Sequence, residues 1–221
     1  MAAAALHFQL IVGNVEEAFY APIRKGMADA AEQLGATAEF IGTTGFDADA
    51  QSALITAAAE NPGVHGIGLQ QAAGDMNAAV ESCMASGTPV VGFSVDASTP
   101  GNQRMSCICQ DFVPSGRSLG SLAAASLTEG CTVLLLHHDD GVDCLEQRIQ
   151  GIKEALQPLN PTFIRAPACG ITMESAATVV GAAMEANPGV DVVIASGQSD
   201  LEGAALCKQR GGIKPEVLVC T

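Results

Sequence analysis

The stretch RMSCICQDFVPSGRSLG, Arg104 to Gly120, decides the fold, because the chain passes here from one half to a second half built on the same plan. Small and apolar residues from Met105 to Ile108 predict a buried strand. Gln110 and Asp111 follow it, and Pro114 suits the first turn of a helix. We therefore expect one α/β lobe over residues 1–110 and a second over residues 111–221.

The segments on either side of this stretch repeat each other. Asn61 to Val64 reads Asn-Pro-Gly-Val, and the same four residues return at Asn187 to Val190, an offset of 126. IRKGM at Ile23 to Met27 has a counterpart in RIQGI at Arg148 to Ile152, an offset of about 125, which is the size of one small domain. Two matches at one offset indicate an internal duplication.

Strand and helix patterns alternate along the whole chain. We expect strands at residues 7–12, 37–41, 64–69, 89–93, 105–108, 131–136, 162–166, 190–195 and 216–220. Amphipathic helices are expected at 23–34, 47–60, 76–84, 115–127, 145–156, 173–186 and from Ser199, with Asp143 and Glu146 forming a capping box for the fifth. This alternation predicts an α/β fold of two similar doubly wound parallel sheets, each covered by helices on both faces.

Composition excludes several classes of function. The formal net charge of −14 and the pI near 4.4 argue against nucleic acid as a partner and disfavour an anionic ligand. No apolar run reaches the roughly 18 residues that a spanning helix needs, so we expect no direct membrane insertion. The first six residues lack the basic start and cleavage region of a signal peptide.

Neither a metal site nor a bound cofactor is expected. The eight cysteines are scattered, without a Cys-x-x-C motif or a histidine at zinc-site spacing. Cys107 and Cys109 point the same way on one strand, a geometry that suits packing better than a bond between them. The run His137 to Asp140 holds four potential ligands, but adjacent side chains in a loop cannot all converge on one ion. Gly66 to Gln71 lacks the third glycine of a dinucleotide-binding motif, and there is no phosphate-binding loop.

In doubly wound sheets, ligands bind beyond the carboxyl ends of the strands. This rule nominates loops 13–20, 43–46, 70–75 and 94–98 in the first lobe, and loops 137–143, 168–172 and 197–199 in the second. Two such lobes, joined by a crossover at residues 110–112, would face each other across a cleft that closes on a small molecule.

These features resemble a known family. The order of elements, the loop Glu17 to Tyr20, the pair Gln110-Asp111 and the run Arg148 to Gly151 are similar to the type 1 periplasmic sugar-binding proteins of the ribose-binding group, along the whole chain. The resemblance implies a periplasmic binding protein-like I fold and a non-enzymatic substrate-binding component of an ABC transporter. It also implies a neutral sugar ligand, a permease or membrane receptor as partner, a periplasmic location and a monomer.

The resemblance also implies roles for individual residues. Phe19 and Tyr20 correspond to aromatics that stack on a sugar ring, although Phe19 could instead hold the following helix against the core. Arg148 corresponds to an arginine that donates forked hydrogen bonds to hydroxyls; the alternatives are an ion pair with Glu146 or a strut between the lobes.

Five further residues complete the expected ligand-binding set. Asp111 would accept from hydroxyls or brace the hinge, and Asp96 corresponds to a hydroxyl-binding aspartate after the 89–93 strand. Gln71 replaces a family asparagine, while Gln198 lies beside the position of another. Asn14 belongs to the first loop.

The chain departs from the family in two respects. Family members are poor in cysteine, and they normally continue past the strand at 216–220 and return to the first lobe. We therefore expect a fragment or a shortened protein, marginally stable because the apolar faces of Ile23, Met27, Val80 and Met84 would be incompletely covered.

Two other functional classes stay open. The first is the ligand-sensing domain of a LacI-type transcription regulator, which would require a DNA-binding segment upstream of His7. The second is an α/β enzyme that uses Cys144 or His138. No nucleophile-elbow pattern supports the enzyme.

Overall fold

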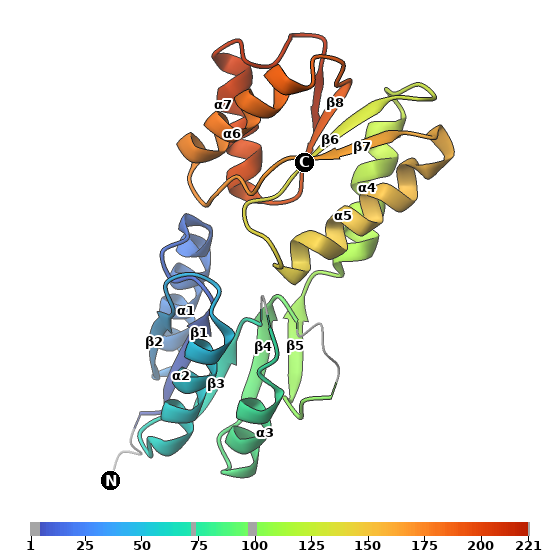
Figure 1. Cartoon of the computed structure of the whole chain (residues 1–221). Helices are drawn as coiled ribbons and strands as arrows, with labels where there is room; N and C mark the ends of the chain where they lie inside the picture. Colours follow the sequence, from blue (N-terminus) through green and yellow to red (C-terminus); the bar gives the residue numbers. More distant parts are fainter. Residues whose placement is uncertain (1–4, 72–73, 97–100, 221) are drawn as a thin grey trace. The chain divides into compact units, whose positions relative to one another are not determined.

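The computed structural model describes residues 5–71, 74–96 and 101–220, in which strands and helices alternate (Figure 1). The strands are β1 (His7–Val12), β2 (Thr37–Gly42), β3 (Gly66–Leu69), β4 (Val90–Ser94), β5 (Ser106–Cys109), β6 (Thr132–Leu136), β7 (Thr162–Arg165), β8 (Val192–Ala195) and β9 (Leu218–Cys220). The α-helices are α1 (Ala21–Leu34), α2 (Ala48–Glu60), α3 (Asn77–Ala85), α4 (Phe112–Ala124), α5 (Asp143–Leu156), α6 (Met173–Ala186) and α7 (Gln198–Gln209), with short 3-10 helices η1 (Ala18–Tyr20) and η2 (Gln157–Leu159). None of the helices in the described ranges is long and apolar enough to cross a membrane.

The chain divides into two compact units, Met1–Gln110 and Asp111–Thr221. The first contains a five-stranded sheet in the order β2-β1-β3-β4-β5, and the second a four-stranded sheet in the order β7-β6-β8-β9. Every neighbouring pair in both sheets is parallel. The predicted α/β class with parallel, helix-covered sheets is therefore confirmed.

The two faces of the first sheet are covered unequally. Ile11, Ile67 and Leu69 point to one face, where they pack with Ile55 of α2 and Val80 of α3 in a buried cluster. Val80 is fully buried, so the expectation of incomplete cover is wrong for this residue, whereas Ile23, Met27 and Met84 are only partly buried.

The opposite face of the first sheet carries α1, since Arg24 of that helix lies 4.1 Å from the ring centroid of Phe40, which alternates with the inward-facing Ile41. No residue of α1 is fully buried. Phe40, Leu10 and Phe93 on this face are only partly buried.

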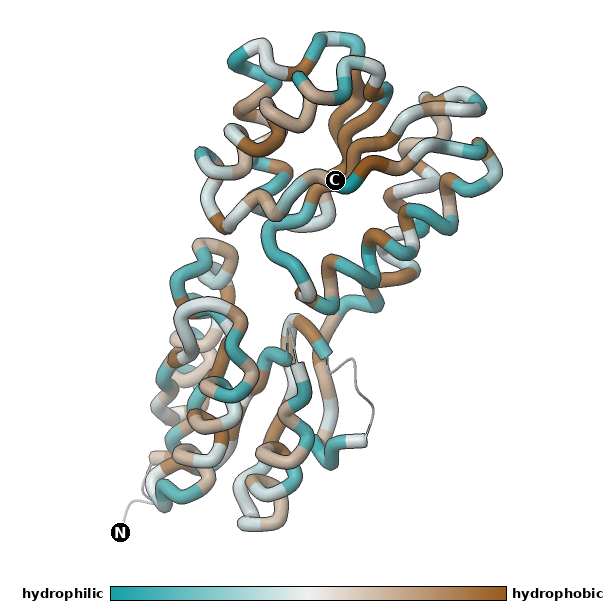
Figure 2. Tube along the Cα trace, in the orientation of Figure 1, coloured by the Kyte–Doolittle hydropathy of each residue, from teal (hydrophilic) through white to brown (hydrophobic). Residues whose placement is uncertain are grey.

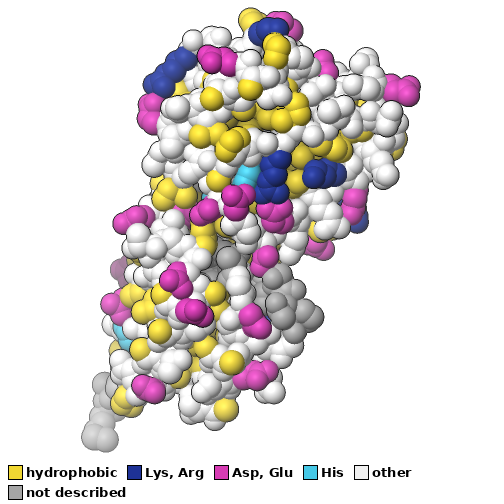
Figure 3. Space-filling model, in the orientation of Figure 1, with side chains coloured by type: hydrophobic (Ala, Val, Ile, Leu, Met, Phe, Trp, Pro, Cys, Tyr) yellow, Lys and Arg dark blue, Asp and Glu magenta, His cyan; other side chains and the backbone are white. Residues whose placement is uncertain are grey.

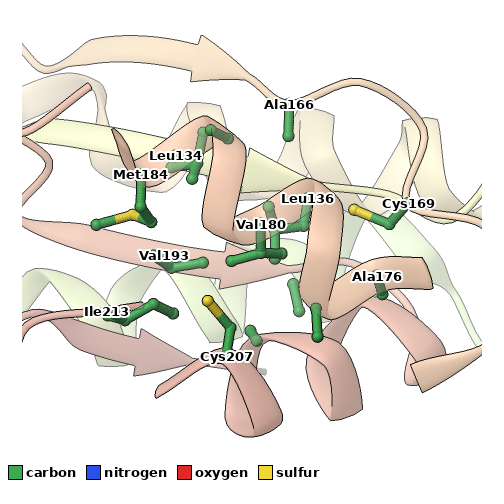
Figure 4. Packing of buried hydrophobic residues seen from close by; sticks show 14 of the residues in the cluster. Leu134, Leu136, Ala166, Cys169, Ala176, Val180, Met184, Val193, Cys207 and Ile213 are labelled. Carbon is green, nitrogen blue, oxygen red and sulfur yellow. The ribbon is translucent and has the colours of Figure 1, made fainter. Parts of the chain in front are cut away.

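The second sheet is covered on both faces. Leu134 and Leu136 point to the side of α6 and α7, where they meet Val180 and Cys207 in the cluster drawn in Figure 4. The alternate residues Val133 and Leu135 pack with Leu119, Ile149 and Ile152 of α4 and α5. In Figure 2 the strands of this sheet form its hydrophobic centre. This is the two-sided burial that continuous apolar strands predict.

Glycines bring α4 and α5 into backbone contact. A Cβ placed on Gly116 would lie 2.0 Å from the carbonyl oxygen of Arg148, and one on Gly151 would lie 2.1 Å from the carbonyl oxygen of Val113. Real Cβ atoms do not approach other atoms so closely, so only glycine fits at either position. The first turns of α5, which carry Arg148, are thereby fixed against α4 by the main chain.

The repeated Asn-Pro-Gly-Val segments occupy equivalent places in the two units. The first follows α2 and precedes β3, and the second follows α6 and precedes β8. In each, the valine amide donates to the carbonyl oxygen of the asparagine, at 2.9 Å for Val64 and 3.2 Å for Val190. The two copies of the repeated segment therefore form the same turn, one in each unit.

The predicted capping box at the start of α5 is wrong. The N-cap is Val142, no side chain caps the helix, and Asp143 is its first residue. Glu146 instead accepts hydrogen bonds from Nη1 and Nη2 of Arg165 on β7. Arg165, which lies 19 residues further along the chain, makes two charge-assisted hydrogen bonds to the Glu146 carboxylate. This carboxylate is therefore not available for the capping box.

Candidate functional site

In the first unit, polar side chains gather where β1 and β3 end. Asn14 is buried after β1, and its Oδ1 accepts from the backbone amide of Glu16 at 3.4 Å. Gln70 follows β3; its Oε1 accepts from the Gly13 amide at 3.0 Å, and Gln51 Nε2 donates to its carbonyl oxygen at 2.6 Å. Gln70 and Gln51, which the sequence analysis missed, tie the two loops together.

Gln71 belongs to a polar network that links three loops. Its side chain is 3 % exposed, and its Oε1 accepts from Asn102 Nδ2 at 3.0 Å. Asn102 also donates to Asn77 at 2.9 Å and accepts from Arg104 Nη1 at 2.6 Å. Within the described ranges, Gln71 Nε2 has no hydrogen-bond partner. A buried donor of this kind calls for an acceptor.

Asp96 is engaged within its own unit. Arg104 Nη2 lies 2.5 Å from its Oδ1 and 2.7 Å from its Oδ2. The side chain of Asp96 is 36 % exposed and that of Arg104 is 19 % exposed. A sugar hydroxyl that reached this carboxylate would have to share it with the guanidinium.

The two aromatic residues after β1 differ in accessibility. Phe19 is 44 % exposed, whereas Tyr20 is completely buried. The Tyr20 ring lies 5.3 Å from that of Phe19, edge-on, and 5.5 Å from that of Phe40, centroid to centroid. The sequence analysis offered a core-packing alternative for Phe19 alone, but Tyr20 is the enclosed residue and Phe19 has the open ring surface, so a stacking role suits Phe19 better than Tyr20.

In the second unit, Arg148 extends from the first turns of α5. Its Nη1 donates to the carbonyl oxygen of Ser196, at the end of β8, and its Cζ lies 4.9 Å from the ring centroid of Phe112. Burial lowers the pKa of the Arg148 guanidinium from its ordinary value. Glu146, the alternative partner expected for Arg148, forms an ion pair with Arg165.

His137 and His138 follow β6 beside a buried carboxylate. His137 is 1 % exposed, and its Nε2 lies 2.8 Å from Asp140 Oδ1. Burial lowers the pKa of His138 despite the opposing charges of Asp200 and Asp139. Asp200 is fully buried, and its Oδ2 accepts from the amides of Ser196 and Gly197 at 2.9 and 3.0 Å. In the part of the chain that the structure describes, this histidine-rich loop forms no metal-ligand group.

Asp111 and Gln198 are both exposed. Asp111 is the N-cap residue of α4, but its side chain makes no capping bond. Gln198 begins α7, and its Nε2 donates to Glu202 Oε1 at 2.8 Å. Asp200, two residues further on, escaped the sequence analysis although its carboxylate organises this loop. The sequence did offer one indication of this role. Asp200 is a charged residue in the first turn of α7, a helix that packs against the second sheet.

Acidic side chains are spread over the visible face of the molecule, whereas lysine and arginine are few (Figure 3). This distribution accords with the net charge of −14. Arg104 and Arg148 are therefore notable as cations placed beside strand ends, each in a separate unit.

Two parallel α/β units with polar residues at the carboxyl ends of their strands define a class of small-molecule-binding proteins. A family model described as periplasmic binding protein domain matches residues 8–221, and the chain belongs to this family. A comparison with curated proteins found no match.

Many solved structures share the fold. One described as the XylFII molecule has a TM-score of 0.89 and 20 % identity, over 97 % of this chain and 79 % of that one. GanP, a glucose-galactose binding protein from Geobacillus stearothermophilus, has a TM-score of 0.83 and 21 % identity, over 97 % and 76 %. An ABC transporter periplasmic solute binding protein from Actinobacillus succinogenes 130z with bound D-allose has a TM-score of 0.83 and 18 % identity, over 97 % and 77 %.

Proposed function

We propose that this protein binds a neutral sugar or a similar polyol, without chemical turnover, as the solute-binding component of an ABC-type uptake or signalling system. Gln71 carries the proposal, because its Nε2 is a buried donor with no partner in the described part of the chain, at the carboxyl end of a parallel strand. A sugar hydroxyl supplies the acceptor that this donor lacks, and a neutral ligand suits a protein with a net charge of −14.

Both units contribute to this function. The first supplies Gln71, Asn14 and the exposed ring of Phe19, and the second supplies Arg148. Asp111 and Gln198 are exposed side chains of the second unit and belong to the proposed ligand-binding set. The buried Tyr20 ring would support Phe19 through their edge-on contact. Asp96 would accept from a sugar hydroxyl only while it also accepts from Arg104.

Known relatives support the transport role over the alternatives. The family is one of binding proteins, and two of the similar structures named above are described as a glucose-galactose binding protein and a solute binding protein. They do not favour the LacI-type regulator or the enzyme. The proposal includes an extracytoplasmic location, a membrane permease or receptor as partner, and a monomeric state.

Calorimetric titration with a panel of neutral pentoses and hexoses, with sugar acids alongside, tests the proposal. We expect micromolar affinity for at least one neutral sugar, equivalent to about 8 kcal/mol. Arg148→Ala should lower that affinity by about tenfold or more, since a hydrogen bond from a charged group contributes about 1.5–3 kcal/mol.

Arg117→Ala is the matched control. Arg117 lies on α4, where its exposed side chain pairs with Glu154 at 2.6 Å, and its removal should leave affinity unchanged. Failure of every neutral sugar to bind, or equal losses in the two variants, would contradict the proposed function.

A further inference from the structure

Three metal-ligating side chains converge at the edge of the first sheet, beside the ion pair of Asp96 with Arg104 described above. They are Asp96, just after β4, and Cys107 and Cys109 on β5, and one ligand atom from each lies within 4.8 Å of the other two. Cys107 pairs with Gly92 and Cys109 with Ser94, so both thiols point to the same face of the sheet. Ser94 has a φ of 64°, and the chain turns there before Asp96.

The space around Cys107 depends on a glycine. A Cβ on Gly92 would lie 2.7 Å from Cys107 Sγ, so a side chain at position 92 would compete with this sulfur for the same space. Cys109 is exposed and Asp96 is partly exposed, which gives an ion a direct approach from solvent.

Arg104 supplies the outer support that metal sites use. Its Nη2 contacts both oxygens of Asp96, and its Nη1 donates to Asn102 Oδ1, so the carboxylate is held in one orientation. Two thiolates and one carboxylate carry three negative charges. A divalent cation would leave one, and the guanidinium offsets it.

We propose that Asp96, Cys107 and Cys109 form a binding site for a thiophilic divalent cation of the zinc type, with water as the fourth ligand. Ligands in a tetrahedral zinc site at about 2.0–2.3 Å from the ion lie roughly 3.5–3.8 Å apart. The ligand atoms lie within 4.8 Å of one another, so they need to approach by at most about 1.3 Å. As each zinc–sulfur bond forms, the thiol releases its proton to solvent, and no electron is transferred.

The test uses the whole 221-residue chain, reduced and freed of metal, with Zn²⁺ as the probe in competition with a chromophoric chelator. We expect one ion per chain. Cobalt substitution should give a thiolate-to-cobalt charge-transfer band. Cys109→Ser, an exposed position, should weaken zinc binding by at least about tenfold, and Asp96→Asn should weaken it to a similar extent.

Cys220→Ser is the matched control, because this cysteine lies on β9 outside the cluster and its loss should leave zinc uptake unchanged. Circular dichroism of each variant confirms that it is folded. The proposal is overturned if wild type takes up no zinc, if Cys109→Ser binds it as well as wild type, or if mass spectrometry of the unreduced protein finds Cys107 and Cys109 joined with loss of a pair of hydrogen atoms.

Discussion

At the scale of single residues, neighbours in sequence have different surroundings and therefore different roles. Phe19 and Tyr20 are adjacent, yet one ring is open to solvent and the other is enclosed. Asp96 and Asp200 both follow strands, but the first forms an ion pair with an arginine, whereas the second accepts hydrogen bonds from two backbone amides. The partner, rather than the residue type, determines what each side chain can do.

Substitutions of Phe19 and Tyr20 should have different effects, one mainly on sugar binding and the other mainly on stability. We expect Tyr20→Ala to lower the free energy of unfolding by about 3–5 kcal/mol, because it empties a fully buried site. Phe19→Ala should lower it by less than about 1 kcal/mol but weaken sugar binding. Urea denaturation and calorimetry measure the two effects. A reversed pattern, with Phe19 controlling stability, would show that its ring belongs to the core.

The ion pair between Glu146 and Arg165 should make stability depend on pH. Hydrogen bonds from Arg165 lower the pKa of Glu146 below its usual value. The pair therefore contributes stability above the unfolded-state pKa of about 4.3, and this contribution is lost as pH falls through the folded-state value. Both side chains are more than a third exposed, so the contribution is at most about 1 kcal/mol.

Urea denaturation of wild type and Arg165→Gln at several pH values measures this effect. The difference in unfolding free energy should be constant between about pH 6 and 8 and should shrink below about pH 4. A difference that grew on acidification would mean that Arg165 acts through another group.

At the scale of elements, the contact between α4 and α5 depends on two glycines. We expect Gly116→Ala and Gly151→Ala each to lower stability by more than about 1 kcal/mol, because the added Cβ would overlap a carbonyl oxygen of the facing helix. Displacement of α5 would also move Arg148 and weaken sugar binding. Thermal melts and calorimetry measure both.

Gly26→Ala provides the opposite expectation on another helix. Gly26 lies inside α1 with nothing within 4 Å of the position of its Cβ, so alanine should add about 0.5–1 kcal/mol of stability through helix propensity. Similar changes at all three positions would show that propensity, not close packing, decides the outcome.

Helices and strands were the features of the structure that the sequence predicted best. Apolar periodicity predicted each α-helix and strand, but the expectation that the strand at Met105 to Ile108 is buried is wrong, because β5 is an edge strand and is largely exposed. The bonds of Glu146 to Arg165 and of Gln71 to Asn102 were not predictable, because they join residues 19 and 31 positions apart. The cluster of Asp96, Cys107 and Cys109 likewise depends on which strands are neighbours, and no spacing motif encodes that.

At the scale of the whole molecule, the two units are unequally packed. The second has buried clusters on both faces of its sheet, and the first, over its described residues, has one. Exposed large apolar side chains include Leu34, Met105 and Ile108 of the first unit. The marginal stability anticipated from the sequence thus stays a prediction, and we assign it to the first unit.

We expect the first unit to unfold at lower denaturant concentration than the second. Cys83, buried in the first unit, should become reactive to a thiol reagent before Cys169, buried in the second. Mass spectrometry of protein labelled in increasing urea measures the order. Simultaneous labelling of the two cysteines would show that the units unfold as one cooperative body.

The glycine contact between α4 and α5 also bears on how this protein can vary. In a library that samples all amino acids at positions 116 and 151, only glycine should survive selection for a folded product, whereas position 26 should accept many residues. In an alignment of descendants, Gly116 and Gly151 would thus stand out as sharply as any ligand contact. A search for ligand-binding residues that ranked positions by invariance would select both glycines, although their role is to allow close contact between α4 and α5.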